Sequence, residues 1–294
     1  MTQSKILVTG ASGRLGGAIV RGLLERLPAD RVVATTRTDA AAHAFRALGV
    51  EVRIADYEQA HSLNAALTGI GTLMLVSAAE PGRRVEFHRN AIEAAVRAKV
   101  GLVVYTSMLR AGTSTIRLAR EHRETEEIIR ASGLPFVFLR NGWYAENYTA
   151  SASVAVAHGA VLGSAGEGRL SLATIADFAA AAVAVLTSTE DQSGRTYELA
   201  GDEGITLSEY AAELARQSGK PVVYSNLPED DYERALLGFG LPRVLADLLA
   251  DSDVGASKGE LFDDGRQLSR LIGRPSTPLS RAVADALGGQ VAAH

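Results

Sequence analysis

Short apolar segments alternate with longer helical patterns through the first half of the chain, and this alternation limits the fold more than any other feature. Each apolar segment is a nearly continuous run, as in Ile6–Val8, Val32–Thr36 and Leu102–Tyr105, instead of an alternation of apolar and polar residues. Continuous runs are typical of strands that helices cover on both faces. The pattern therefore predicts an α/β fold of the Rossmann type, with a doubly wound parallel sheet.

The rhythm changes after Arg140, where the helical patterns become longer and the strands fewer. A single helix is expected over Trp143–Ala157, and no linker rich in Pro, Gly or Ser separates the two halves. We expect a nucleotide-binding Rossmann domain over residues 1–140 and a smaller, mainly helical lobe over 141–294. Some segments of the second half, for example 174–200, are candidates to return to the first domain.

Charge and composition exclude several classes of protein. The formal net charge is −4 and no run is rich in Lys or Arg, so the basic surface of a nucleic-acid-binding protein is missing. The chain has no cysteine, and no histidine pair has the spacing of metal ligands. The longest conspicuous apolar run, Phe178–Leu186, is much shorter than the roughly 20 residues that span a bilayer. We expect a cytoplasmic protein without metal, nucleic-acid or membrane partners; a homodimer is compatible with the sequence.

A glycine-rich loop follows the first predicted strand and leads directly into a helix. The loop reads Gly10-Ala11-Ser12-Gly13-Arg14-Leu15-Gly16. Such a loop lets the backbone approach a pyrophosphate, whose charge then lies at the free N–H groups of the helix N-terminus. The third glycine allows close packing of helix and strand. Because strand, loop and helix occur in this order, the loop predicts dinucleotide binding instead of an ordinary tight turn.

Arg37 indicates which dinucleotide is bound. It follows the second strand, where NAD-binding folds usually place an acid on the ribose hydroxyls. A guanidinium there can hold the 2′-phosphate of NADP(H), and Arg14 could supply a second cation; the alternative is a solvated arginine. Asp56, after the third strand, is a candidate for contacting the adenine, although an exposed loop acid would fit equally well.

Small residues end the fourth and fifth strands, at the edge where open α/β sheets bind ligands. We expect the cofactor to lie against this edge, although the hydroxyls could instead serve the turns. The residues are Ser77, Ala78, Ala79, Thr106 and Ser107.

The chain lacks the usual proton donor of short-chain dehydrogenases, a Tyr followed four residues later by Lys. None of the four lysines stands at that spacing from a tyrosine. His122 and Glu126 have this i,i+4 spacing, and we interpret them as a surface ion pair on a helix.

The segment after the sixth predicted strand concentrates aromatic and amide side chains. Residues 140–148 hold the only Trp of the chain, with two of its eight Tyr and two Asn. Flat apolar faces beside amide groups suit a planar ring that must be oriented by its oxygens. The alternative is an aromatic anchor between the two lobes, and both roles are compatible.

These motifs together resemble the NmrA-like branch of the atypical short-chain dehydrogenases, and within it the bacterial NADPH-dependent quinone oxidoreductases. Besides the glycine loop, the resemblance rests on Tyr105–Ser107, on Arg140–Tyr148 and on Leu245–Asp264. It covers nearly the whole chain. Triphenylmethane reductases share the family's fold and cofactor, but their pattern at 140–143 lacks the Gly-Trp found here.

The resemblance implies direct two-electron transfer of hydride from NADPH to a quinone, without flavin. It also implies cofactor contacts at Arg140, Asn141 and Gly142. Trp143, Tyr144 and Tyr148 would bind the quinone, and Asn141 and Tyr144 would orient it. Two other functions stay open: a nonenzymatic NADP(H)-binding redox sensor, and a reductase of another planar electrophile such as a triarylmethane or azo dye.

Overall fold

The computed structural model describes residues 4–288 of the chain. These residues form two compact units. Of the described residues, the first consists of 4–108, 121–140 and 178–197, and the second of 109–120, 141–177 and 198–288. The two units are similar in length, and each is built from segments that are far apart in the sequence.

A seven-stranded sheet organises the first unit. Its order is β3-β2-β1-β4-β5-β6-β8, so the chain moves outward from β1 in one direction and then from β4 in the other. The pairs β1–β2, β2–β3, β1–β4 and β4–β5 are parallel. The strands are β1 (Lys5–Val8), β2 (Val32–Thr36), β3 (Glu51–Ile54), β4 (Ile70–Leu75), β5 (Leu102–Met108), β6 (Phe136–Asn141) and β8 (Thr196–Leu199).

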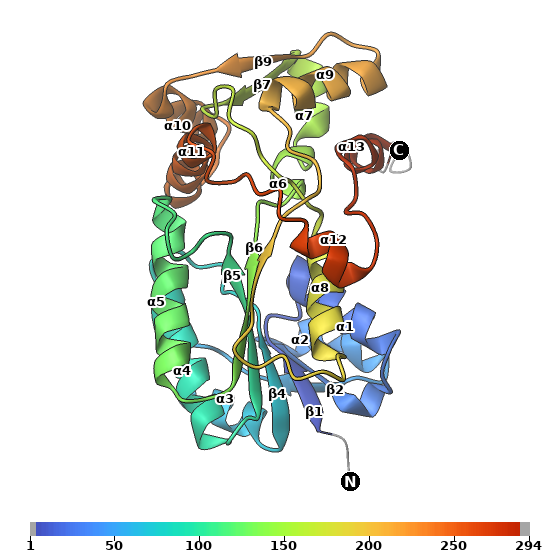
Figure 1. The fold of residues 1–294 in the computed structure, drawn as a ribbon, viewed down its shortest axis with the longest axis vertical. Helices are drawn as coiled ribbons and strands as arrows, with labels where there is room; N and C mark the ends of the chain where they lie inside the picture. Colours follow the sequence, from blue (N-terminus) through green and yellow to red (C-terminus); the bar gives the residue numbers. More distant parts are fainter. Residues whose placement is uncertain (1–3, 289–294) are drawn as a thin grey trace. The chain divides into compact units, whose positions relative to one another are not determined.

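Helices cover both faces of this sheet, which is why its strands are apolar along their whole length (Figure 1). On one face lie α3 (Ala60–Leu67), α4 (Arg84–Arg97) and α5 (Arg117–Ala131). On the other lie α1 (Arg14–Leu24), α2 (Asp39–Arg46) and α8 (Ile175–Leu186). The doubly wound Rossmann-type fold is thereby confirmed, and its reversal of strand order falls between β1 and β4.

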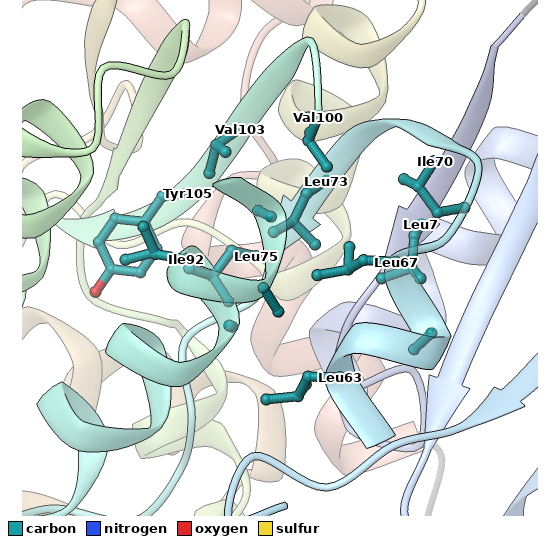
Figure 2. Packing of buried hydrophobic residues seen from close by; sticks show 14 of the residues in the cluster. Leu7, Leu63, Leu67, Ile70, Leu73, Leu75, Ile92, Val100, Val103 and Tyr105 are labelled. Carbon is teal, nitrogen blue, oxygen red and sulfur yellow. The ribbon is translucent and has the colours of Figure 1, made fainter. Parts of the chain in front are cut away.

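The core beneath the first of these faces is made by branched side chains from the strands and from α3 and α4. Figure 2 shows Leu7, Leu73, Leu75 and Val103 from neighbouring strands, together with Leu67 from α3. All five are buried. This packing fixes the carboxyl edge of the sheet, from which the predicted cofactor residues project.

The second unit is mainly helical and contains a small parallel sheet of two strands, β7 (Ala160–Gly163) and β9 (Val223–Asn226). The helices are α6 (Glu146–Thr149), α7 (Ala152–His158), α9 (Leu207–Ser218), α10 (Glu229–Gly238), α11 (Arg243–Ser257), α12 (Gln267–Ile272) and α13 (Leu279–Gly288).

The helix expected over Trp143–Ala157 is wrong in its first part. The amide of Ala145 donates to the carbonyl of Ala173, and the amide of Ala173 donates to the carbonyl of Trp143. These bonds hold residues 143–145 in a bridge to a distant segment, so the chain turns helical only at α6 and again at α7.

Candidate functional site

The glycine loop has the backbone geometry of a phosphate cradle. Gly10 has φ +59°, and the amide of Gly13 donates to its carbonyl over 2.9 Å. A side chain at Gly16 would lie 2.3 Å from that same carbonyl oxygen, so only glycine permits this approach of α1 to the loop. The N-cap residue of α1 is Gly13, so no side chain caps the helix, and its first turn holds no acidic residue. The first amides of the helix and its positive dipole end are therefore suited to an anion.

The glycine loop contains both buried residues, which pack on the sheet, and exposed residues. Ala11 and Leu15 are buried, and the amide of Ala11 donates to the carbonyl of Thr35 in β2. Ser12 and Arg14 are exposed. The buried residues fix the loop on the sheet, while the exposed ones lie at its surface.

Arg37 lies just beyond the end of β2 and forms an ion pair with Glu80. The two side-chain atoms are 3.1 Å apart and both side chains are exposed. Since β1 lies between β2 and β4 in the sheet, this pair joins the segments that follow the two strands beside the glycine loop. An exposed pair of this kind is worth at most about 1 kcal/mol, so the guanidinium can change partner at little cost.

Asp56 is committed to a local turn. Its carboxylate accepts a hydrogen bond from the amide of Glu58 over 3.0 Å. A carboxylate has a second oxygen and further lone pairs, so this bond leaves capacity for another donor.

Hydrogen bonds bring together the small residues at the ends of β4 and β5. The amide of Ser77 donates to the hydroxyl of Thr106 over 2.8 Å, and the amide of Ala78 donates to the ring Nε2 of His88 over 3.0 Å. Ala79 is exposed, whereas Ala78 and Thr106 are buried. The ring of His88 must stay neutral to accept this bond, and burial lowers its pKa to about 3.

The interpretation of His122 and Glu126 as a surface ion pair is wrong. Both side chains are buried and they serve different partners. The Nδ1 atom of His122 lies 2.7 Å from the hydroxyl of Tyr105. Burial holds the pKa of His122 well below its ordinary value, so the ring is neutral and carries no charge to pair. Since residues of β5 and β6 contact this face of α5, the i,i+4 spacing marks a buried face.

Glu126 joins two predicted site residues. Its carboxylate, 1 % exposed, accepts the hydroxyl of Ser107 over 2.7 Å and the guanidinium of Arg140 over 2.8 and 2.7 Å. Burial alone would raise the pKa of Glu126, but the bonds from Arg140 and Ser107 hold it below the ordinary value. Glu126 is therefore ionised and ties the ends of β5 and β6 together. No local sequence pattern marks this role, because Ser107 and Arg140 lie 19 and 14 residues from Glu126 in the chain.

The aromatic segment begins at the carboxyl end of β6, in the second unit. The amide of Gly142 donates to the carbonyl of Leu199 over 2.6 Å, and a side chain at Gly142 would lie 3.0 Å from that oxygen. Trp143 and Tyr148 are buried, whereas Tyr144 is partly exposed. Burial raises the pKa of the Tyr144 hydroxyl, and the neighbouring Asn141 amide opposes the rise. Tyr144 is thus protonated at neutral pH and can donate a hydrogen bond.

The side-chain amide of Asn141 is buried but lacks normal hydrogen bonds. It is 5 % exposed, and among residues 4–288 neither its oxygen nor its nitrogen has a partner of normal hydrogen-bond geometry. The backbone of the same residue is satisfied, since its carbonyl accepts the amide of Leu109 over 2.8 Å. A buried amide without partners costs about 1–3 kcal/mol. Such a group is expected where a ligand supplies the missing partners.

No helix among the described residues is both long enough and apolar enough to cross a membrane.

The chain is similar to known reductases over nearly its whole length. It is 51% identical to quinone oxidoreductase 2 of Escherichia coli strain K12 over 278 residues, which are 95% of this chain and 97% of that protein. A crystal structure of NADPH-dependent quinone oxidoreductase QOR2 from Escherichia coli, complexed with NADPH, superposes with a TM-score of 0.93 at 50% identity, covering 96% and 99% of the two chains. For the triphenylmethane reductase of Citrobacter sp., complexed with NADP(H), the TM-score is 0.92 at 34% identity, with coverage of 96% and 100%.

The family model for the NmrA-like family matches residues 2–273. This match covers most of the chain, and it agrees with the strand order and the glycine loop described above. The chain belongs to the NmrA-like family.

Proposed function

We propose that the protein is an NADPH-dependent quinone oxidoreductase, which transfers hydride directly to a quinone as a two-electron step without flavin or metal. The observation that carries this proposal is the similarity to the quinone oxidoreductase of Escherichia coli, at 51% identity across almost all of both chains. At this level of identity the fold and the main features of a site are normally shared. The geometry of the chain's own residues gives independent support.

The residues of the first unit fit NADPH. The N-terminus of α1, which no side chain caps, and the close approach at Gly16 suit the pyrophosphate, and no carboxylate in the first turn opposes it. Arg37 would exchange Glu80 for the 2′-phosphate, with Arg14 as a second cation and Asp56 beside the adenine. When bound, NADPH supplies the hydride.

We assign the remaining cofactor contacts to residues at the ends of three strands. Backbone and small side chains there allow close approach, and the bonds of Thr106 and Glu126 hold them in place. These contacts are Ser77, Ala78, Ala79, Thr106, Ser107, Arg140, Asn141 and Gly142.

The substrate side is assigned to the aromatic segment. Trp143, Tyr144 and Tyr148 offer flat faces to a quinone ring, and the unpartnered amide of Asn141 offers a donor to a ring oxygen. As hydride adds to the ring, negative charge develops on that oxygen, where a donor already in place lowers the barrier. A quinone is already a strong electrophile. Proximity and hydrogen bonds from Asn141, Tyr144 or water therefore suffice, without a Tyr–Lys pair.

We place the enzyme in the cytoplasm, acting on a small-molecule quinone, with a homodimer as a compatible assembly. The direct test is NADPH consumption with a panel of quinones, azo dyes and triarylmethane dyes. We expect turnover to be fastest with quinones and to persist in chelator, with protein that shows no flavin absorption after dialysis. Binding of NADPH without turnover of any acceptor would contradict the proposal and favour a redox sensor.

Trp143→Ala separates a substrate contact from a mere anchor. A substrate contact raises the Michaelis constant for quinone about three- to tenfold, as expected for an aromatic contact of roughly 0.5–1.5 kcal/mol, and leaves NADPH affinity close to unchanged. An anchor would lower the melting temperature and weaken the kinetics of both substrates together.

A further inference from the structure

A buried carboxylate in α11 belongs to the stretch 245–264, which the proposed function does not use. Asp253 is 3 % exposed. Its Oδ1 accepts the hydroxyl of Tyr148 over 2.9 Å, and its Oδ2 accepts the amide of Ser164 over 2.9 Å. One carboxylate thus links α11 to the residue after β7 and to the end of the aromatic segment.

The surroundings of Asp253 are costly for a carboxylate. The titratable side chains that face it are Tyr148 from α6, Tyr224 from β9 and Tyr232 from α10. Both of its hydrogen bonds come from neutral donors, a phenol and a backbone amide. Burial raises the pKa of Asp253 to about 6, so at neutral pH the group is mostly ionised in an apolar setting. A buried charge that weakens the fold is a candidate for a functional role.

Tyr148 is held at two ends. Its hydroxyl is bound by Asp253, and its carbonyl accepts the hydroxyl of Tyr210 over 3.1 Å. The rings of Tyr148 and Tyr210 also pack, with centroids 5.9 Å apart. The hydroxyl of Tyr148 is therefore committed to Asp253, and what this residue can offer a substrate is its ring.

Backbone bonds fix the rest of the aromatic segment at Gly142, Trp143 and Ala145. Beyond these, the carboxylate of Glu146 accepts the amide of Ile175 over 3.0 and 3.1 Å. At the far end of the segment, the side chain of Tyr148 supplies a further fixed point through Asp253. We propose that Asp253 is a positioning residue of the quinone site, which acts through the Tyr148 hydroxyl to fix the segment 141–148. The proposal rests on the proposed function for its substrate.

Asparagine at position 253 breaks the bond pattern while conserving shape. Asp253 accepts from two donors with two oxygens, whereas asparagine has one oxygen and its NH₂ group only donates. Since the amide of Ser164 takes the remaining oxygen, the hydroxyl of Tyr148 loses its charged acceptor and meets an NH₂ group, from which it can accept only a weaker, neutral bond. Tyr148→Phe removes the bond altogether and keeps the ring.

Trp143 is the only tryptophan of the chain, so its fluorescence reports on this segment without any ligand. The experiment compares Asp253→Asn, Tyr148→Phe and the double variant with Asp247→Asn. Asp247 is a matched control because it lies on the same helix and pairs with Arg117 at the surface. Three quantities are measured: quenching of Trp143 by acrylamide, the Michaelis constant for a quinone at saturating NADPH, and the dissociation constant of NADPH.

We expect both single variants to raise the quenching constant about twofold and the quinone Michaelis constant about fivefold or more, with NADPH affinity within twofold. The double variant should be no worse than the worse single variant, because both changes act on the same bond. Asp247→Asn should match the unmutated protein. Unchanged quenching in both single variants would overturn the proposal. A loss of NADPH affinity as large as the rise in the quinone Michaelis constant would overturn it as well.

Failure of the proposed function gives a different result. The unmutated protein would then turn over no quinone, while the quenching measurement would still report whether Asp253 fixes the segment.

Discussion

The glycine loop and the aromatic segment differ in what builds them. The loop binds through backbone amides, and its geometry depends on residues within seven positions of one another, Gly10 to Gly16. The aromatic segment presents side chains, and their placement depends on Leu199, Ala173 and Asp253, which are distant in the sequence. A site made of backbone is therefore visible in a short motif, whereas a site made of side chains is fixed by contacts that no local pattern shows.

Gly13→Val tests the backbone site and should have the largest effect. A Cβ atom there would lie 3.2 Å from the Gly10 carbonyl oxygen, a tight contact that requires a small shift of the loop, and the branched side chain would block the approach of the pyrophosphate. We expect NADPH affinity to fall about 100-fold or more, since two or more charge-assisted bonds of roughly 1.5–3 kcal/mol each are lost. Calorimetric titration and circular dichroism measure binding and fold.

Gly238→Val is the control for this variant, because a side chain at that glycine would meet nothing within 4 Å. It should bind NADPH normally. Normal binding by Gly13→Val would move the phosphate site elsewhere.

Arg37→Ala tests the side chain to which we assign the preference of the cofactor site for NADPH over NADH. We expect the preference for NADPH over NADH to shrink about 10- to 150-fold, the value of a bidentate contact of roughly 1.5–3 kcal/mol. Arg46→Ala, which removes another exposed arginine and its ion pair with Asp39, should leave the preference intact. Equal affinity of the unmutated protein for both cofactors would refute this assignment.

Asn141→Ala tests the side-chain site. The loss should fall mainly on turnover, about tenfold and less than the roughly 100-fold seen where an oxyanion is fully localised. The melting temperature should change little, because among the described residues the amide has no hydrogen bond of normal geometry to lose. Steady-state kinetics measure the turnover, and a thermal scan measures the melting temperature. A lower melting temperature with unchanged turnover would show that the amide has a purely structural role.

The pH dependence of stability tests the support beneath the side-chain site. The pKa of Asp253 is about 6 in the native state, above the ordinary value of 3.8, so the native state holds this proton more tightly than the unfolded state. Stability therefore falls as pH rises from about 4 to about 6. Relative to Asp253→Asn, the unmutated protein should lose at most roughly 3 kcal/mol over this range.

Chemical denaturation at pH 4.5, 6 and 7.5 measures this difference. Asp247→Asn should show the same fall in stability as the unmutated protein, because it retains Asp253. A constant difference between the unmutated protein and Asp253→Asn at all three values would mean that the carboxyl titrates normally.

The sequence predicted the sheet, the first six strands and the glycine loop because each depends on local apolar runs or on glycine. It failed where long-range contacts override a local pattern. Residues 143–145 have a helical pattern but pair with Ala173, and Glu126 has the spacing of a surface pair but is buried beneath Ser107 and Arg140. For the site, the sequence indicated which residues to consider. The unsatisfied amide of Asn141 and the bond between Tyr148 and Asp253 required coordinates.

The discontinuity of the first unit has a consequence for biosynthesis. Its sheet takes β6 from 136–141 and its edge strand β8 from 196–199, and α8 covers one face. A nascent chain that has emerged only as far as residue 140 thus exposes β6 as an open edge and leaves one sheet face partly bare. The nucleotide-binding unit cannot complete itself on the ribosome until residue 199 has left the exit tunnel. A truncation before that point is expected to need chaperones or to aggregate.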